Sequence, residues 1–186
     1  MQRRQFTFSA SSVLLAGCAR ESDAATFEAL KLGGHVLYFR HAATDRSGVD
    51  MPDWSRARQR NLSAFGKQQS RKIGAGISGR GIPVGQVLAS PFYRCTDMAE
   101  LAFGRSRKDR GLLSSANKVG DVGGRVNYLK RRLTTPFKGP NLVLISHSNN
   151  IRLAAGTELS EGEAAVFRPR GRGVFEELAI VAPEMW

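Results

Sequence analysis

The chain has 186 residues, of which 28 are Lys or Arg and 16 are Asp or Glu, so its formal net charge is +12. Hydrophobic residues make up 41% and charged residues 24%, which are ordinary values for a globular domain and exclude a largely disordered chain. A single domain of this length buries a sizeable core. The positive charge excludes an acidic solvating protein and favours anionic partners, such as phosphorylated molecules, anionic lipid headgroups or nucleic acid.

Residues 1–17 have the order of a secretory signal peptide. Arg3 and Arg4 precede an apolar and small-residue run, which ends in Leu15-Ala16-Gly17-Cys18. The arginine pair resembles the twin-arginine export motif, and the last four residues resemble the bacterial lipobox, whose cysteine is lipidated and becomes the first mature residue. We therefore expect residues 1–17 to be removed, Cys18 to carry lipid, and residues 18–33 to tether a domain that spans 34–186. Residues 21–32 are polar and alanine-rich, so they either belong to this tether or begin as a short helix.

These signals also predict where the protein resides. The longest stretch without Asp, Glu, Lys or Arg, 5–19, is shorter than the roughly 20 residues that cross a bilayer, so no mature transmembrane helix is expected. The export and lipidation signals predict the periplasmic side of a bacterial envelope. Ala19 follows the lipidated cysteine in place of the aspartate that retains some lipoproteins at the inner membrane, which favours the outer membrane.

Three short apolar runs predict the centre of a sheet. Because the runs are continuous rather than alternating, they are typical of strands covered on both faces, as in a parallel sheet with helices above and below. They cover residues 35–39, 85–89 and 141–145.

Helices are predicted between these strands, and a hairpin after them. The first helix follows Asn61 and ends in a Gly-rich stretch closed by Pro83. The hairpin is expected to lie antiparallel at the sheet edge. The fold class is therefore α/β, a three-layer α/β/α sandwich with a mostly parallel central sheet. The predicted helices are 62–77, 94–103 and 122–133, and the predicted hairpin strands are 163–168 and 174–181.

Cationic and imidazole side chains follow each of the three predicted central strands. Arg40 and His41 end the first strand, Arg94 comes shortly after the second, and His147 follows the third. Ligands of open α/β sheets bind beyond the carboxyl ends of the strands, so these side chains are expected to meet at one edge. Two arginines and two histidines in one pocket make an anion site, because the guanidinium fork matches phosphate oxygens.

These elements resemble the motifs of the histidine phosphatase superfamily, also called phosphoglycerate mutase-like proteins. The family's Arg-His-Gly motif stands here as Arg40-His41-Ala42, its Leu-Ser-x-x-Gly helix start as 62–66, its Ser-Pro-x-x-Arg element as 90–94, and its late histidine as His147. The resemblance covers 34–186. Residues 161–186 look like the tail of small secreted bacterial members.

The resemblance implies a phosphomonoester hydrolase in which His41 attacks phosphorus and forms a phosphohistidine that water then hydrolyses. Arg40, Arg94 and His147 would neutralise the phosphoryl oxygens, and Thr44 would direct its hydroxyl toward the phosphate. No cofactor and no metal ion is implied. The substrate would be a phosphorylated small molecule or a phosphoprotein, and the sequence leaves open which one, as well as the oligomeric state.

The chain also departs from the family pattern. Ala42 and Ser148 stand where the family has glycines, and either change reduces activity if the backbone must approach the phosphate closely. The general acid is not identified; the candidates are Asp121, which lies between the second and third strands, then Asp45 and Asp97. An alternative function is a catalytically weak or inactive phosphate-binding module. Nucleic acid is not an expected partner, because only 8% of the residues are aromatic.

Overall fold

The computed structural model describes residues 24–116 and 120–186. The strands in these ranges are β1 Val36–Arg40, β2 Val84–Ala89, β3 Arg107–Lys108, β4 Asn141–Ser146, β5 Ala164–Gly171 and β6 Val174–Val181. The helices are α2 Ala64–Gly79, α3 Tyr93–Phe103, α4 Val122–Thr134 and α5 Ser148–Ala155, with short 3₁₀ turns η1 Arg110–Leu112 and η2 Pro183–Met185. Residues 24–31 are also helical.

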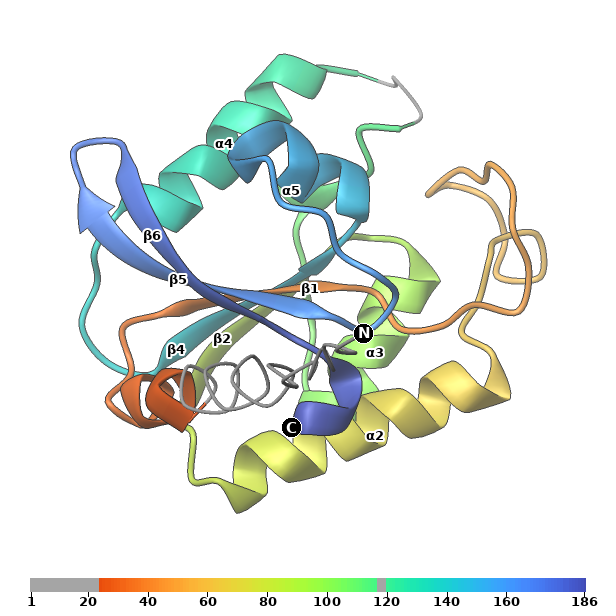
Figure 1. Cartoon of the computed structure of the whole chain (residues 1–186). Coiled ribbons are helices and arrows are strands. Elements are labelled where there is room, and N and C mark those ends of the chain that lie inside the picture. Colours follow the sequence, from red (N-terminus) through yellow and green to blue (C-terminus); the bar gives the residue numbers. More distant parts are fainter. Residues whose placement is uncertain (1–23, 117–119) are drawn as a thin grey trace, which may run out of the picture.

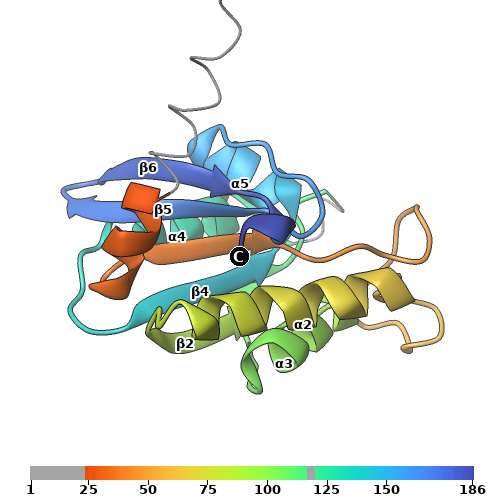
Figure 2. The same cartoon turned by 60° about the horizontal axis from the view of Figure 1, so that its bottom comes forward.

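The six strands form one sheet in the order β3-β2-β4-β1-β5-β6 (Figure 1). The neighbours β3, β2, β4 and β1 run parallel to one another, whereas β5 pairs antiparallel with β1 and β6 pairs antiparallel with β5. Helices α2 and α3 lie together on one face of the sheet, and α4 and α5 lie on the other (Figures 1 and 2). The sandwich expected from the sequence, with its antiparallel edge hairpin, is confirmed.

The continuous apolar runs are explained by a core on each face of the sheet. Successive side chains of a strand point to opposite faces, so a strand covered on both sides needs apolar residues at every position. In β1, Leu37 and Phe39 pack toward α2 and α3, and Val36 and Tyr38 belong to the second cluster with the apolar side chains of α4 and α5. Burial on both faces therefore fixes the position of β1 at the centre of the domain.

Helix α5 lies outside the helices predicted from the sequence, whereas the helix at 24–31 falls in the stretch 21–32, for which a short helix was one of two expectations. Helix α5 has only eight residues, begins directly after His147 and ends at Gly156, whose φ is 78°. Its first residues are polar, so the segment shows too little apolar periodicity to predict a helix. The described part of the expected tether contains the helix at 24–31, whose Phe27 and Leu30 are buried in the core beside α2.

Three strands end level with one another, and this places the residues that follow them side by side. Arg40 at the end of β1 pairs with Ser146 at the end of β4, and Ala89 at the end of β2 pairs with Ile145. The backbone N–H of His41 donates to the Ser146 carbonyl at 3.0 Å. The edge at which ligands bind in such sheets is thus formed by the first residues after β1, β2 and β4.

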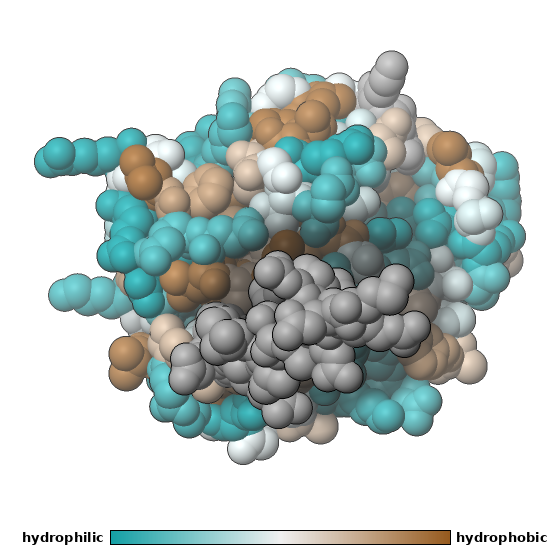
Figure 3. All heavy atoms as spheres, in the orientation of Figure 1, coloured by the Kyte–Doolittle hydropathy of each residue, from teal (hydrophilic) through white to brown (hydrophobic). Residues whose placement is uncertain are grey.

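The surface seen in Figure 3 is covered mostly by hydrophilic side chains, with hydrophobic ones scattered between them. Isolated exposed apolar residues of this kind are normal for a folded domain. Within the described ranges, no helix combines the length and hydropathy that crossing a bilayer requires.

The start of α2 is fastened to the loop that follows His41. Ser63 caps the helix by accepting a hydrogen bond from the Gly66 N–H at 3.0 Å, and the Ser63 N–H donates to the Ala43 carbonyl at 3.0 Å. A Cβ atom on Gly66 would lie 2.0 Å from the same Ala43 oxygen. Glycine is therefore required at position 66, because any side chain there would force the helix away from the loop.

This contact predicts that Gly66→Ala lowers the free energy of unfolding by about 1–3 kcal/mol, as overpacking against backbone does. Gly79→Ala, at the other end of the same helix, is the control, since its Cβ would meet nothing within 4 Å. That control should be neutral or stabilise by up to about 1 kcal/mol, because alanine favours a helix over glycine. Urea unfolding of both variants measures the difference; equal stabilities would contradict the close approach.

Candidate active site

His41 is buried directly after β1, and one of its two ring nitrogens carries no hydrogen. Its Nδ1 lies 2.9 Å from the Ala42 carbonyl oxygen. A carbonyl only accepts hydrogen bonds, so Nδ1 carries the hydrogen and Nε2 is unprotonated in the neutral ring. The pKa of His41 is lowered well below its usual value, first by burial and then by the positive charge of Arg94. His41 is therefore a neutral imidazole with a free Nε2 at neutral pH.

His147 is the second buried imidazole and stands after β4, directly before the first residue of α5. The two histidine rings lie edge to face, with their centroids 5.6 Å apart. Nδ1 of His147 is 3.4 Å from Nη2 of Arg94, and Nε2 is 2.9 Å from Oγ of Ser90. A guanidinium only donates, so Nδ1 accepts and Nε2–H donates to Ser90. Burial and then Arg94 lower the pKa of His147 well below its usual value.

Arg94, in the first turn of α3, is the buried cation of the site. Its Nη1 donates to Oδ2 of Asp50 at 2.8 Å, and its guanidinium lies 4.2 Å from the centroid of the Phe92 ring. A buried cation is costly unless a carboxylate pairs with it, so Asp50 supplies the required countercharge. The ion pair and the ring hold the guanidinium in place, with Nη2 next to His147.

Arg40, Thr44 and Arg60 meet at the carboxylate of Glu161. Oε1 of Glu161 lies 3.6 Å from Arg40 Nη2, 3.3 Å from Arg60 Nη2 and 3.9 Å from His41 Nδ1. It also accepts a hydrogen bond from the Thr44 hydroxyl at 3.1 Å. The group formed by these four polar side chains is thus a second charged cluster, which lies beside His41.

The structure brings together the predicted residues His41, His147 and Arg94, and places Arg40 and Thr44 beside them. The predicted lipidation site, Cys18, lies outside the described residues. Four further polar residues of the site have no role predicted from the sequence. The loop after β1 and the turn before β5 carry three of them, and no local motif marks them. The four are Asp50, Arg60, Ser90 and Glu161.

The carboxylates predicted as proton donors are engaged elsewhere or exposed. Asp121 caps α4, where its Oδ1 accepts from the Gly124 N–H at 2.7 Å. Asp97 makes a two-point ion pair with Arg56, and the Asp45 side chain is exposed. None of these observations links the three side chains to either histidine.

The two departures from the family's glycines cause no backbone strain. In the described residues, Arg172 is the non-glycine residue with a positive φ, so Ala42 and Ser148 adopt conformations open to any side chain. Ala42 is buried, and Ser148 is the first residue of α5. A glycine is therefore not required at either position for conformational reasons.

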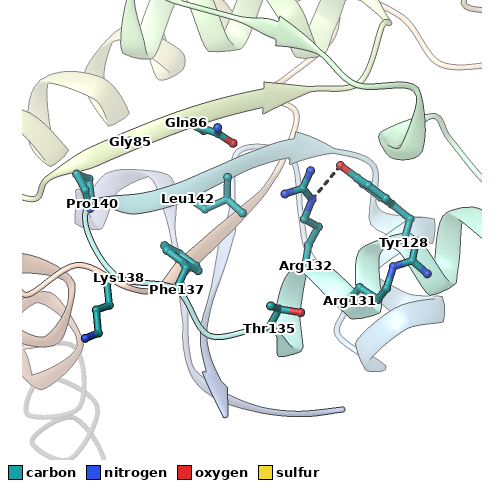
Figure 4. A pocket seen from close by; sticks show the side chains of 10 residues that line it. All are labelled: Gly85, Gln86, Tyr128, Arg131, Arg132, Thr135, Phe137, Lys138, Pro140 and Leu142. Carbon is teal, nitrogen blue, oxygen red and sulfur yellow. Dashed lines mark hydrogen bonds between the residues drawn. The ribbon is translucent and has the colours of Figure 1, made fainter. Parts of the chain in front are cut away.

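A separate cavity of about 630 Å³ lies near the amino ends of β2 and β4, at the opposite end of the strands from the histidines (Figure 4). Its lining includes Arg131, Arg132 and Lys138, and Arg132 donates to the hydroxyl of Tyr128, one turn away on the same helix α4. It contains no histidine and no carboxylate. The candidate active site is therefore the group of His41, His147 and Arg94, which we call the histidine cluster. Among residues 24–116 and 120–186, no group of three His, Cys, Asp or Glu side chains is arranged to hold a metal ion.

Neither protein-family models nor curated protein sequences match the chain. Solved structures do. The protein histidine phosphatase SixA complexed with tungstate has a TM-score of 0.61 at 17% identity, over 80% of this chain and 97% of that one. A mutant phosphoserine phosphatase from Entamoeba histolytica in complex with phosphoserine has a TM-score of 0.58 at 12% identity, over 81% and 98%. A mutant of a Thermus thermophilus protein has a TM-score of 0.54 at 19% identity, over 80% and 99%.

These structural neighbours are members of the histidine phosphatase superfamily, so the chain has the phosphoglycerate mutase-like fold. At such low identities the likeness establishes the fold, and the function has to be argued from the site.

The two buried histidines predict a loss of stability in acid. Their pKa values are lowered in the folded protein, so the unfolded chain takes up protons near pH 6.5 while the folded chain does not. Their contribution is fully present above about pH 6.5 and is lost as the pH falls below it, with a slope of up to about 2.7 kcal/mol per pH unit for two protons. Urea unfolding between pH 5 and 8 gives the free energy of unfolding at each pH. This free energy should change less with pH in the double variant His41→Asn/His147→Asn than in the wild type. Identical slopes would refute burial of neutral rings.

Proposed function

We propose that the protein is a metal-independent phosphomonoester hydrolase that works through a phosphohistidine on His41. The observation that carries the proposal is the neutral His41 ring, whose unprotonated Nε2 is held in a buried cluster with Arg94 and His147. An imidazole in this state is a nucleophile, and the neighbouring cations suit a phosphoryl group.

The reaction proceeds in two displacements. Nε2 of His41 attacks phosphorus, the bond from phosphorus to the leaving oxygen breaks, and the phosphoryl group is carried on the histidine. Water then attacks the phosphohistidine, the N–P bond breaks, and its electron pair returns to Nε2. Splitting one difficult displacement in this way is the general advantage of covalent catalysis.

The arginines stabilise the charge on the phosphoryl oxygens. Asp50 fixes Arg94 before the substrate arrives, so little reorganisation is needed, and a preorganised donor of this kind is typically worth about 2.7–4 kcal/mol. The Nε atoms of Arg40 and Arg94 are buried without a hydrogen-bond partner among the described residues. Buried donors without partners are uncommon, and they support an anionic ligand at this place.

The structural neighbours support the same class of substrate. One is described as a protein histidine phosphatase and was solved with tungstate, a tetrahedral oxyanion, and another was solved with phosphoserine. By analogy, the substrate of this protein is a phosphorylated small molecule or a phosphoprotein.

His41→Asn is expected to reduce phosphate release from p-nitrophenyl phosphate by at least about 10³-fold, because it removes the nucleophile. His35→Asn is the matched control, since His35 packs at the start of β1 with its Nδ1 2.8 Å from the Gly33 carbonyl, outside the cluster. Rapid quenching of the wild type in alkali with labelled substrate should trap an acid-labile phosphohistidine. Unchanged release by the His41 variant would overturn the assignment, and phosphate binding without turnover in the wild type would favour the inactive binding module.

We further propose that the protein is exported and lipid-anchored through Cys18, on the periplasmic side of the envelope and with the outer membrane favoured, as in the small secreted branch of the family. The support is the sequence of residues 1–19, with its arginine pair, apolar run and lipobox. This stretch lies outside the residues that the structure describes.

Metabolic labelling with a fatty-acid analogue tests this anchor. The wild type should incorporate the label and fractionate with membranes, whereas Cys18→Ser should do neither. Cys95→Ser is the control, because Cys95 is buried inside the domain and should not affect labelling. Equal labelling of the wild type and Cys18→Ser would refute lipidation at this residue.

A further inference from the structure

The proposed hydrolysis leaves one role without a residue. The leaving oxygen needs a proton as its bond to phosphorus breaks, and a positioned general acid contributes roughly 10²–10⁴-fold to such a step. Asp121 and Asp97 are engaged with a helix terminus and with Arg56, as described above. The Asp45 side chain is exposed, which leaves the carboxylates that border the two histidines as the next candidates.

Two carboxylates border the histidine cluster, and their surroundings differ. The Asp50 side chain is buried, pairs with Arg94 at 2.8 Å and accepts from the backbone N–H of Arg60 at 2.8 Å. If Asp50 lost its charge or moved away, Arg94 would be a buried cation without a countercharge. Asp50 is therefore needed to hold that arginine in position. Oε1 of Glu161 lies 3.9 Å from Nδ1 of His41, the nitrogen that does not attack, and the two arginines that pair with Glu161 are partly exposed.

The solvent exposure of the side chains shows which way a substrate must point. The side chains of His41 and Arg94 are each 4% exposed, whereas those of Arg40, Arg60 and Glu161 are 21–26% exposed. An attack by Nε2 places the leaving oxygen on the far side of phosphorus from the imidazole. The rest of the substrate therefore extends toward solvent, and Glu161, at 26% exposed against 5% for Asp50, is the more accessible of the two carboxylates that border the cluster.

The backbone around Glu161 is tied to the nucleophile. The N–H of Gly162 donates to the His41 carbonyl at 3.1 Å. Thr44, three residues after His41, donates its N–H to Oε2 of Glu161 at 3.3 Å and its hydroxyl to Oε1. These contacts join the turn before β5 to the loop after β1, so Glu161 keeps its place relative to His41.

The charges around Glu161 allow it to exchange roles when substrate binds. In the free protein it is the counterion of Arg40 and Arg60, with Thr44 and His41 as its other polar neighbours. A phosphoryl dianion that binds the same arginines replaces the carboxylate as their partner. It also brings negative charge next to that carboxylate, and a proton shared between the two groups relieves their repulsion.

We propose that Glu161 is the general acid and base of the reaction, an inference that rests on the proposed function. As His41 Nε2 attacks, the P–O bond breaks and the leaving oxygen takes the proton of the Glu161 carboxyl, which gives an alcohol, a phosphohistidine and a carboxylate. The carboxylate then takes a proton from the attacking water. The N–P bond breaks, inorganic phosphate leaves, and the neutral histidine and the protonated carboxyl are regenerated.

A series of substituted phenyl phosphates tests this role in the full-length protein. p-Nitrophenolate departs without a proton, whereas p-methoxyphenolate needs one. Glu161→Gln keeps the size of the side chain and removes the acid, so the loss of kcat/KM should be about 10²-fold greater with p-methoxyphenyl phosphate than with p-nitrophenyl phosphate. A plot of log kcat/KM against the pKa of the leaving phenol should therefore have a steeper slope in the variant than in the wild type.

Glu158→Gln is the matched control, because Glu158 lies in the same turn and pairs with Arg152 on the surface. It should follow the wild type across the series. Equal losses for all leaving groups in Glu161→Gln would show that Glu161 only positions other groups, and no loss would show that it is dispensable; either result overturns the proposal. If the wild type hydrolyses none of the series, the proposed function itself fails.

Discussion

The buried ion pair between Arg94 and Asp50 is the interaction on which the rest of the site depends. A guanidinium inside the domain is tolerated because a carboxylate compensates its charge at 2.8 Å. The same guanidinium donates to His147, and its positive charge adds to burial in lowering the pKa values of both His41 and His147. Asp50 thus supports the proposed nucleophile indirectly, since without it the cation that adds to burial in keeping the imidazoles neutral would lose its fixed position.

The sheet supplies the geometry that this pair requires. Strands β1, β2 and β4 end in register, so the residues after them emerge at one edge although they come from distant parts of the chain. Helix α2 fastens the loop after β1 through Ser63 and Gly66, which leaves no room for a side chain at that contact. The residues of the histidine cluster are therefore positioned by backbone pairing and close packing rather than by the loops alone.

Much of the fold was predictable, because a strand buried on both faces leaves a continuous apolar run and the helices between such strands carry their own stop signals. His41, Arg94 and His147 were predictable for the same reason, since each directly follows a strand or starts the next helix. Asp50 and Glu161 were not. Asp50 lies in the long loop after β1, and Glu161 lies in the turn before β5. In neither segment does the local sequence indicate which side chains will contact the histidines and Arg94. Helix α5 was missed because eight residues with a polar start carry too little periodicity.

The helix at 24–31 changes how the domain would sit relative to a lipid on Cys18. Phe27 and Leu30 pack in the core, and the ring of Phe27 lies 5.6 Å from that of the terminal Trp186, so this helix is part of the globule. With the anchor proposed above, only the residues from 18 to 23 would separate the acyl chains from the folded body. Fully extended, they reach roughly 20 Å. Such a short connection would keep the whole domain next to the bilayer, so that it meets chiefly molecules that are themselves close to the lipid surface.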